Sequence, residues 1–167
     1  MFTGHLGLAL GAHGMWPRVP LWALVVAALL PDLVNTAWQL TGRGDPGDLQ
    51  SHAWLPAGLA AAVMAIGYFV GRRDRGGAAV LAGVVLSHLL ADYVTSREPT
   101  WPGGPRIGLH WYRYDLLDFT VEGSVVILGW WLYRRQIPQV ARRAWPLGVM
   151  LGALLLFQFL FQLLPIT

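Results

Sequence analysis

Residues 76–94 read GGAAVLAGVVLSHLLADYV, an apolar run of membrane-spanning length that contains a histidine and an aspartate. His88 and Asp92 are four residues apart, so they share one face of a helix. An ionisable side chain in the middle of a membrane costs about 2.5–3.5 kcal/mol on the insertion scale, and such residues usually face the bundle interior at a functional site. A hydrogen bond that only joins helices is the structural alternative for this pair.

The composition of the whole chain agrees with this span. Hydrophobic residues make up 55% of the 167 residues, charged residues only 13%, and the mean hydropathy is +0.48. These values are typical of a polytopic membrane protein. The chain has no cysteine, which excludes disulfides and thiolate ligands. The pI of 9.8 comes from arginines beside apolar segments, so we expect no nucleic-acid partner.

We predict an all-α bundle of five to six transmembrane helices that forms one integral membrane domain, residues 1–167. A helix needs roughly 20 apolar residues to cross the hydrocarbon. Five segments meet or approach this length: 21–40, 53–70, 76–94, 119–133 with an extension back to about Asp115, and 147–166. Residues 2–16 are shorter and rich in glycine, and they form either a sixth span or a half-buried partner helix.

The arginines predict the orientation of the bundle. Positive residues favour the cytoplasmic side of a membrane. One side of the predicted topology receives eight of the twelve basic residues, which are Arg18, Arg72, Arg73, Arg75, Arg134, Arg135, Arg142 and Arg143. We therefore expect a multi-pass protein of the inner (plasma) membrane, with residues 41–50 and 95–114 on the extracytoplasmic side.

In this topology the polar residues of the spans converge near the outer leaflet. The residues at that depth are His5, Asp32, His52, His88, Asp92, His110, Asp118 and Glu122. For Asp32 the structural alternative is a hydrogen bond to backbone that Pro31 has freed within its helix. His52 and His110 are also compatible with a simple interfacial position.

Histidine nitrogens and carboxylate oxygens without cysteine indicate a divalent metal ion, with zinc or manganese favoured. A bound metal lowers the pKa of a water molecule and so provides a hydroxide nucleophile. Asp32 or Asp118 is the predicted catalytic base if it is not itself a ligand. Arg106, Arg113 and His110 in the outer loop are predicted to bind an anionic substrate.

Four short motifs occur in a recognisable order. They are Thr3-Gly4-His5, Leu30-Pro31-Asp32, Ser51-His52 and the run Ser87-His88-Leu89-Leu90-Ala91-Asp92. This pattern resembles the YdjM-like inner-membrane proteins, a family described as membrane-bound metal-dependent hydrolases. The resemblance covers about residues 1–95. It implies a metal site formed by His5, Asp32, His52, His88 and Asp92.

The sequence therefore predicts a metal-dependent hydrolase near the outer leaflet, which acts on a phospholipid or another lipid-linked ester or phosphoester. Membrane lipid and a lipid-like substrate are the expected partners, and an oligomer or a larger membrane complex is compatible with the chain. Two other functions remain open. The first is a non-catalytic accessory subunit with a bound cofactor, for example a haem between His52 and His88. The second is an ion- or proton-handling component of a transporter.

Overall fold

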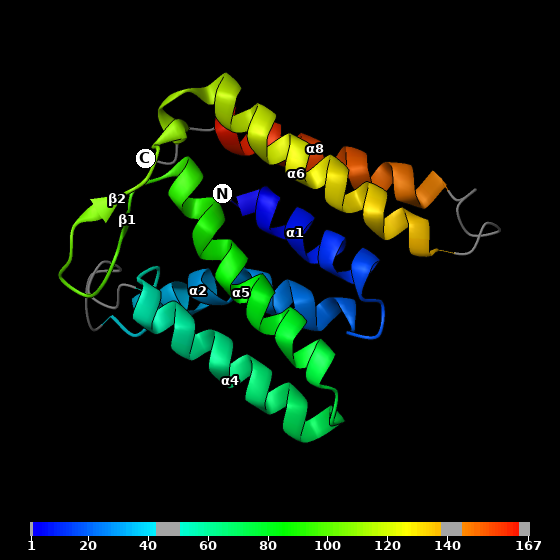
Figure 1. Ribbon diagram of the computed structural model, residues 1–167. Helices are drawn as coiled ribbons and strands as arrows, with labels where there is room; N and C mark the ends of the chain where they lie inside the picture. The colour runs from blue at the N-terminus through cyan, green and yellow to red at the C-terminus, as the bar shows by residue number, and fades with distance from the viewer. Residues whose placement is uncertain (1, 43–50, 138–144, 164–167) are drawn as a thin grey trace.

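The computed structural model describes residues 2–42, 51–137 and 145–163, and these residues are almost entirely helical (Figure 1). The elements in chain order are α1 (Phe2–Met15), α2 (Leu21–Leu40), α4 (Trp54–Arg72), α5 (Arg75–Thr95), β1 (Glu98–Pro99), β2 (Arg106–Ile107), the 3-10 turn η1 (Trp111–Arg113), α6 (Asp115–Gln136) and α8 (Trp145–Leu163). The predicted all-α fold is confirmed.

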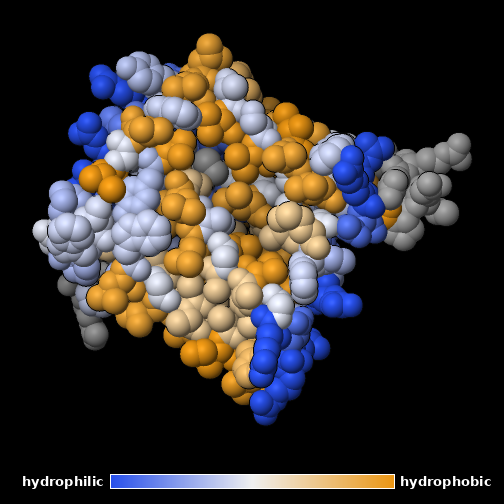
Figure 2. Space-filling model, viewed as in Figure 1, coloured by the Kyte–Doolittle hydropathy of each residue, from blue (hydrophilic) through white to orange (hydrophobic). Residues whose placement is uncertain are grey.

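Among the described residues, four helices are long and apolar enough to cross a membrane, namely α2, α4, α5 and α6. The apolar part of α8 spans Pro146–Leu160, and α1 has only 14 residues. Large apolar side chains are exposed on the outer faces, for example Val63 at 70% and Leu116 at 80%. Figure 2 shows these apolar side chains across most of the visible surface. In water such a surface would be a liability, whereas in a bilayer it faces lipid.

The helix boundaries follow local signals. The turn between α4 and α5 contains Arg73 in a left-handed conformation (φ 57°). Asp74 then caps α5, because its side chain accepts a hydrogen bond of 3.0 Å from the backbone N–H of Gly77. Pro31 lies inside α2 and is buried without ending that helix. Proline is tolerated inside membrane helices where neighbouring groups satisfy the backbone that it frees.

Helices α1 and α6 pack side by side through glycines (Figure 1). A Cβ atom at Gly7 would lie 2.7 Å from the carbonyl oxygen of Val125, and one at Gly129 would collide with the backbone of Gly7. Small residues let helix backbones approach closely in membranes, where van der Waals packing replaces the hydrophobic driving force between helices. This contact fixes the short helix α1 against a longer membrane helix.

The two ends of the bundle differ in chemistry. Figure 1 shows the connections from α1 to α2 and from α4 to α5 at one end, and the β1–β2 hairpin at the other. The first end carries more of the described arginines, among them Arg72, Arg73 and Arg134, while exposed Arg106 and Arg113 lie at the hairpin end, and Figure 2 shows hydrophilic patches on both sides. The hairpin is tied to the helices by hydrogen bonds from the Trp54 N–H to the Thr100 carbonyl (3.1 Å) and from the Leu109 N–H to the Tyr93 carbonyl (2.8 Å).

Candidate metal centre

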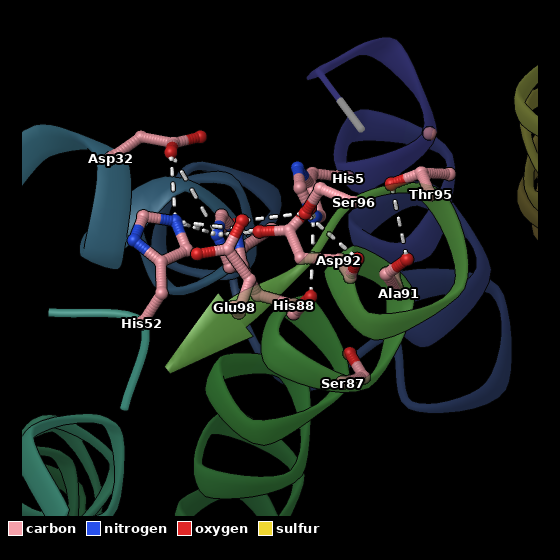
Figure 3. Close-up of polar contacts among 12 residues, drawn as sticks. His5, Asp32, His52, Ser87, His88, Ala91, Asp92, Thr95, Ser96 and Glu98 are labelled. Atoms are coloured by element: carbon pink, nitrogen blue, oxygen red, sulfur yellow. Dashed lines mark hydrogen bonds and ion pairs between the residues drawn. The ribbon is translucent and has the colours of Figure 1, made fainter. Parts of the chain in front are cut away.

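Four segments bring five ionisable side chains together near the hairpin end of the bundle (Figure 3). Two groups of three have ligand atoms within 4.8 Å of one another: His5, His88 and Asp92 form one, and Asp32, His52 and His88 form the other. His88 belongs to both groups. These are the five residues that the YdjM-like resemblance implies as ligands, and the structure brings their ligand atoms together, whereas His110, Asp118 and Glu122 of the predicted polar layer belong to neither group.

Three of the ligand atoms form a nearly equilateral triangle. The Nε2 atom of His88 lies 3.0 Å from Asp92 Oδ2 and 3.1 Å from His52 Nε2, and the His52 Nε2 atom lies 3.3 Å from Asp92 Oδ2. The fourth atom, Asp32 Oδ1, is 3.2 Å from His52 Nε2 and 3.8 Å from His88 Nε2. Thus two nitrogens and two carboxylate oxygens surround one small volume.

The backbone of α2 fixes the proton of His88. The Nδ1 atom lies 2.6 Å from the carbonyl oxygen of Ala28, which can only accept a hydrogen bond. Nδ1 therefore carries the proton, and Nε2 presents its lone pair to His52 and Asp92. A hydrogen bond from the second ring nitrogen to a backbone carbonyl is the arrangement that orients histidine ligands in metal sites.

The His52 ring is fixed in the same way from the opposite side. The Ser51 hydroxyl donates to the Pro31 carbonyl (3.1 Å), so its oxygen is left to accept from His52 Nδ1 at 3.0 Å. The amide nitrogen of Asn35 also lies 3.3 Å from this Nδ1 atom, and as a donor it would require Nδ1 to accept. Asn35 Oδ1 is buried without a hydrogen-bond partner, and an exchange of its oxygen and nitrogen positions would provide a second acceptor there.

These protonation states leave only electron pairs pointing into the cluster. When both rings are neutral and carry their proton on Nδ1, the lone pairs of His52 and His88 face each other and the Asp92 carboxylate at hydrogen-bond distance. Such an arrangement is repulsive unless a cation or additional protons lie between the atoms. The geometry therefore favours either a metal ion or an additional proton between these atoms.

His5 lies behind this triangle. Its ring stacks on the ring of His88, with centroids 3.7 Å apart. Its Nε2 atom is 3.4 Å from Asp92 Oδ1 and 3.4 Å from the His88 carbonyl oxygen. Because both neighbours are acceptors, Nε2 is best placed as a donor to Asp92. His5 Nδ1 is buried and has no hydrogen-bond partner among the described residues.

The cluster is closed on one side and open on the other. The side chains of His88 and His5 are 0% and 1% exposed, whereas 36% of the Asp32 side chain is accessible. Burial lowers the pKa of His52, but its hydrogen bond to Asp32 and the charges of Asp92 and Glu98 outweigh this effect and raise the pKa above its ordinary value. The net field at the open side therefore favours positive charge.

Two deep carboxylates of α6 lie beside α1. Glu122 is 4% exposed, and its Oε2 atom accepts hydrogen bonds from the Thr3 N–H (3.1 Å), the Thr3 hydroxyl (2.7 Å) and the Gly4 N–H (3.1 Å). It thus caps the first turn of α1 from another helix. Asp118, a predicted base, is 3% exposed in the first turn of α6 and belongs to neither ligand group.

The predicted substrate-binding residues lie at the surface of the outer loop. Arg106 is on β2, His110 precedes η1 with a left-handed backbone (φ 58°), and all three side chains are exposed. The guanidinium of Arg113 lies 5.3 Å from the ring centre of Tyr114. Their role in substrate binding remains a prediction.

Sequence reasoning missed several residues that support the cluster. Asn35 follows Asp32 by three positions and so shares its helix face, which was an available signal. Glu98 on β1 lies beside the cluster in Figure 3, and its Oε1 atom accepts a hydrogen bond of 2.5 Å from Ser96. The carbonyl of Ala28 has no sequence signal, because any residue provides a carbonyl.

Comparison of the chain with protein-family models, with curated proteins and with solved structures gives no match.

Proposed function

We propose that this chain is a multi-pass protein of the inner (plasma) membrane that binds a divalent metal ion and hydrolyses a lipid-linked ester or phosphoester. The observation that carries the proposal is the triangle formed by His52 Nε2, His88 Nε2 and Asp92 Oδ2, with edges of 3.0–3.3 Å. Tetrahedral ligands at about 2.0–2.1 Å from a zinc ion lie about 3.3–3.4 Å apart. The triangle is therefore close to the size that such an ion requires.

Two histidines and one carboxylate are a common ligand set of hydrolytic zinc sites, in which a fourth position stays open. In this arrangement His52, His88 and Asp92 hold the ion, and zinc or manganese suits these donors. His5 acts on Asp92, to which it donates from Nε2, and so fixes the carboxylate that binds the ion. This assigns His5 a supporting role in place of the ligand role that the YdjM-like resemblance implies.

Asp32 is the residue best placed to act as the base. Its Oδ1 atom is 3.2 Å from His52 Nε2 and 3.8 Å from His88 Nε2, beside the open position, and its side chain is 36% exposed. A metal ion at this site would supply a water molecule whose pKa is near 7. Asp32 would accept a proton from the attacking water and return it to the leaving group. This position favours Asp32 over Asp118, which belongs to neither ligand group.

The substrate class follows from the depth of the site. The cluster lies where membrane-length helices meet the outer hairpin, a depth at which a lipid headgroup can approach laterally. Arg106, His110 and Arg113 are exposed in the adjacent loop and would neutralise an anionic headgroup. The arginine-rich end of the bundle supports a cytoplasmic location for that end and an extracytoplasmic location for the site.

Metal analysis of purified protein tests the centre of the proposal. We expect about one equivalent of transition metal in the wild type, and its loss in His88→Ala and Asp92→Ala. His13→Ala is the matched control, because His13 is also a helical histidine but contacts the Val19 carbonyl, away from the cluster. Equal metal content in His88→Ala and His13→Ala would refute the site.

Reconstituted protein in vesicles of mixed phospholipids tests the reaction. Released headgroup, diacylglycerol and fatty acid are measured, and we expect turnover that His88→Ala abolishes. Stoichiometric metal without turnover of any lipid would instead favour the accessory-subunit function. If no metal is bound, proton transfer along the histidines and aspartates, as in a transporter, becomes the better explanation.

A further inference from the structure

A groove of about 450 Å³ runs between α1 and α5. Its walls are apolar or small, and they include Leu8 and Ala12 of α1, Trp16 directly after α1, and Val80, Gly83 and Val84 of α5. Ser87 also lines the groove, but its hydroxyl donates to the Val84 carbonyl within the same helix at 2.8 Å. The groove therefore offers little to a polar ligand.

The groove is aligned with the candidate metal centre. Leu8 and Ala12 follow His5 by three and seven positions, so they lie on the same face of α1. Val84 precedes His88 by one helical turn on α5. Leu8 and Val84 are therefore each about one helical turn from His5 and His88, whose rings stack with centroids 3.7 Å apart. One end of the groove thus lies about one turn from this stacked pair.

A second apolar groove of about 350 Å³ lies mainly between α2 and α4 and provides a comparison. It is lined by residues such as Val26, Val63 and Gly67, and it extends to Arg72 at the arginine-rich end. Its nearest point to the cluster on α2 is Val26, six residues before Asp32. This second groove does not lead to a residue of the ligand cluster.

We propose that the groove between α1 and α5 binds an acyl chain of the substrate. Binding of the chain would place the ester or phosphoester bond of the lipid at the depth of the metal centre. The inference rests on the proposed function and narrows its substrate to acyl-chain lipids. The occupant is an acyl chain because α5 is a membrane-length helix, the groove is apolar, and lipid chains are the apolar molecules present at that depth.

The affinity of this groove has to come from packing. Lipid chains are as apolar as the protein surface, so the hydrophobic effect does not favour one groove over another. Close van der Waals contact does, because each atom pair adds a small attraction and a chain in a groove makes many pairs. Filling the groove should therefore remove the preference without changing the metal ligands.

Gly83 offers a clean way to fill it. Gly83 is exposed, and a Cβ atom at this position meets nothing within 4 Å. The Cβ atom of a leucine at Gly83 therefore meets no neighbour, and the rest of its side chain is expected to occupy the groove. Gly67 lines the second groove and is equally open, so Gly67→Leu is the matched control. Val80→Phe fills the first groove from another position and serves if Gly83→Leu does not fold.

The probe is a phosphatidylcholine vesicle that contains a phospholipid with a photoactivatable diazirine on one acyl chain. After irradiation, cross-linked peptides of the full-length protein are identified by mass spectrometry. We expect preferential cross-links to the α1 and α5 residues of the first groove, and roughly tenfold lower yield in Gly83→Leu but not in Gly67→Leu. Cross-links of equal yield in both grooves would overturn the inference.

This experiment needs no turnover, so the two proposals can fail separately. Preferential cross-links without hydrolysis of any lipid would support the groove and refute the proposed function. Lipid hydrolysis with equal KM in wild type and Gly83→Leu, without preferential cross-links, would support the proposed hydrolase and refute acyl-chain binding in this groove. Cross-linking of His88→Ala at wild-type yield is expected, because the groove contains no metal ligand.

Discussion

Glu122 connects α6 to the candidate metal centre through α1, and its replacement is the most informative perturbation outside the ligand cluster. One carboxylate oxygen accepts three hydrogen bonds, two from Thr3 and one from Gly4, directly before His5. His5 in turn contacts Asp92 and stacks on His88. Loss of the carboxylate should therefore loosen the first turn of α1 and change the support of Asp92.

The magnitude follows from the donors that would lose their partner. Glu122→Ala leaves two backbone N–H groups and one hydroxyl unsatisfied in a buried site, at about 1–3 kcal/mol each when water cannot replace the carboxylate. Glu122→Gln keeps an acceptor oxygen and loses mainly the charge next to the helix N-terminus, about 1 kcal/mol. Changes in the groups that orient metal ligands typically weaken metal binding about 10–100-fold.

Zinc affinity, measured by competition with a chromophoric chelator, is the first assay, and the absorption spectrum of the cobalt-substituted protein is the second. We expect a large loss of affinity and an altered spectrum in Glu122→Ala, and a smaller loss in Glu122→Gln. Ser124→Ala is the control, since its hydroxyl only donates to the Thr120 carbonyl on the exposed face of α6. Wild-type zinc affinity and spectrum in folded Glu122→Ala would refute the connection between α6 and the site.

Three further predictions address the base, the substrate contacts and the orientation. Asp32→Asn should lower kcat about 10²–10⁴-fold with little loss of metal, whereas Asp118→Asn should affect kcat much less. Steady-state lipid hydrolysis and metal analysis together check this. A larger loss of kcat in Asp118→Asn than in Asp32→Asn would make Asp118 the base. Arg106→Gln and Arg113→Gln should raise KM for an anionic lipid more than they lower kcat, and an equal loss of kcat and kcat/KM would instead show contacts made only in the transition state. A cysteine at the exposed Leu109 should react with an impermeant thiol reagent from the extracytoplasmic side, while one at Gly71 beside Arg72 should not. The chain has no native cysteine that could react in its place. The reverse labelling would place the metal centre on the cytoplasmic side.

The membrane-length helices could be predicted from the sequence because their signal is local. Hydrocarbon thickness sets the length of a span, and unsatisfied backbone groups in lipid force each span to be helical. Helix α2 begins at Leu21 and ends at Leu40, as predicted, and α5 differs from its predicted range by one residue at each end. Within the described residues, α8 covers Trp145–Leu163, and the last residues of the predicted segment 147–166 lie outside them.

The residues of the cluster could also be predicted from the sequence. Histidine and aspartate are costly inside a membrane, so each marks a position that has to face a partner. The alternation of the spans then places residues far apart in the chain at one depth. These rules placed eight residues at one depth, and the family resemblance selected His5, Asp32, His52, His88 and Asp92 among them; neither says which atoms face one another.

Only the tertiary structure decides how the cluster works. The proton on His88 depends on the carbonyl of Ala28, and that on His52 depends on Ser51 and its bond to Pro31. Glu122 was expected only to lie at the depth of the polar layer, and its partner in the structure is the first turn of α1, where Thr3 is 119 residues away in the sequence. Local hydrophobicity determines where a helix crosses the membrane. The rotation and close approach of the helices, set here by glycines such as Gly7 and Gly129, determine which donors and acceptors meet, because a hydrogen bond depends on distances and angles that no single helix specifies.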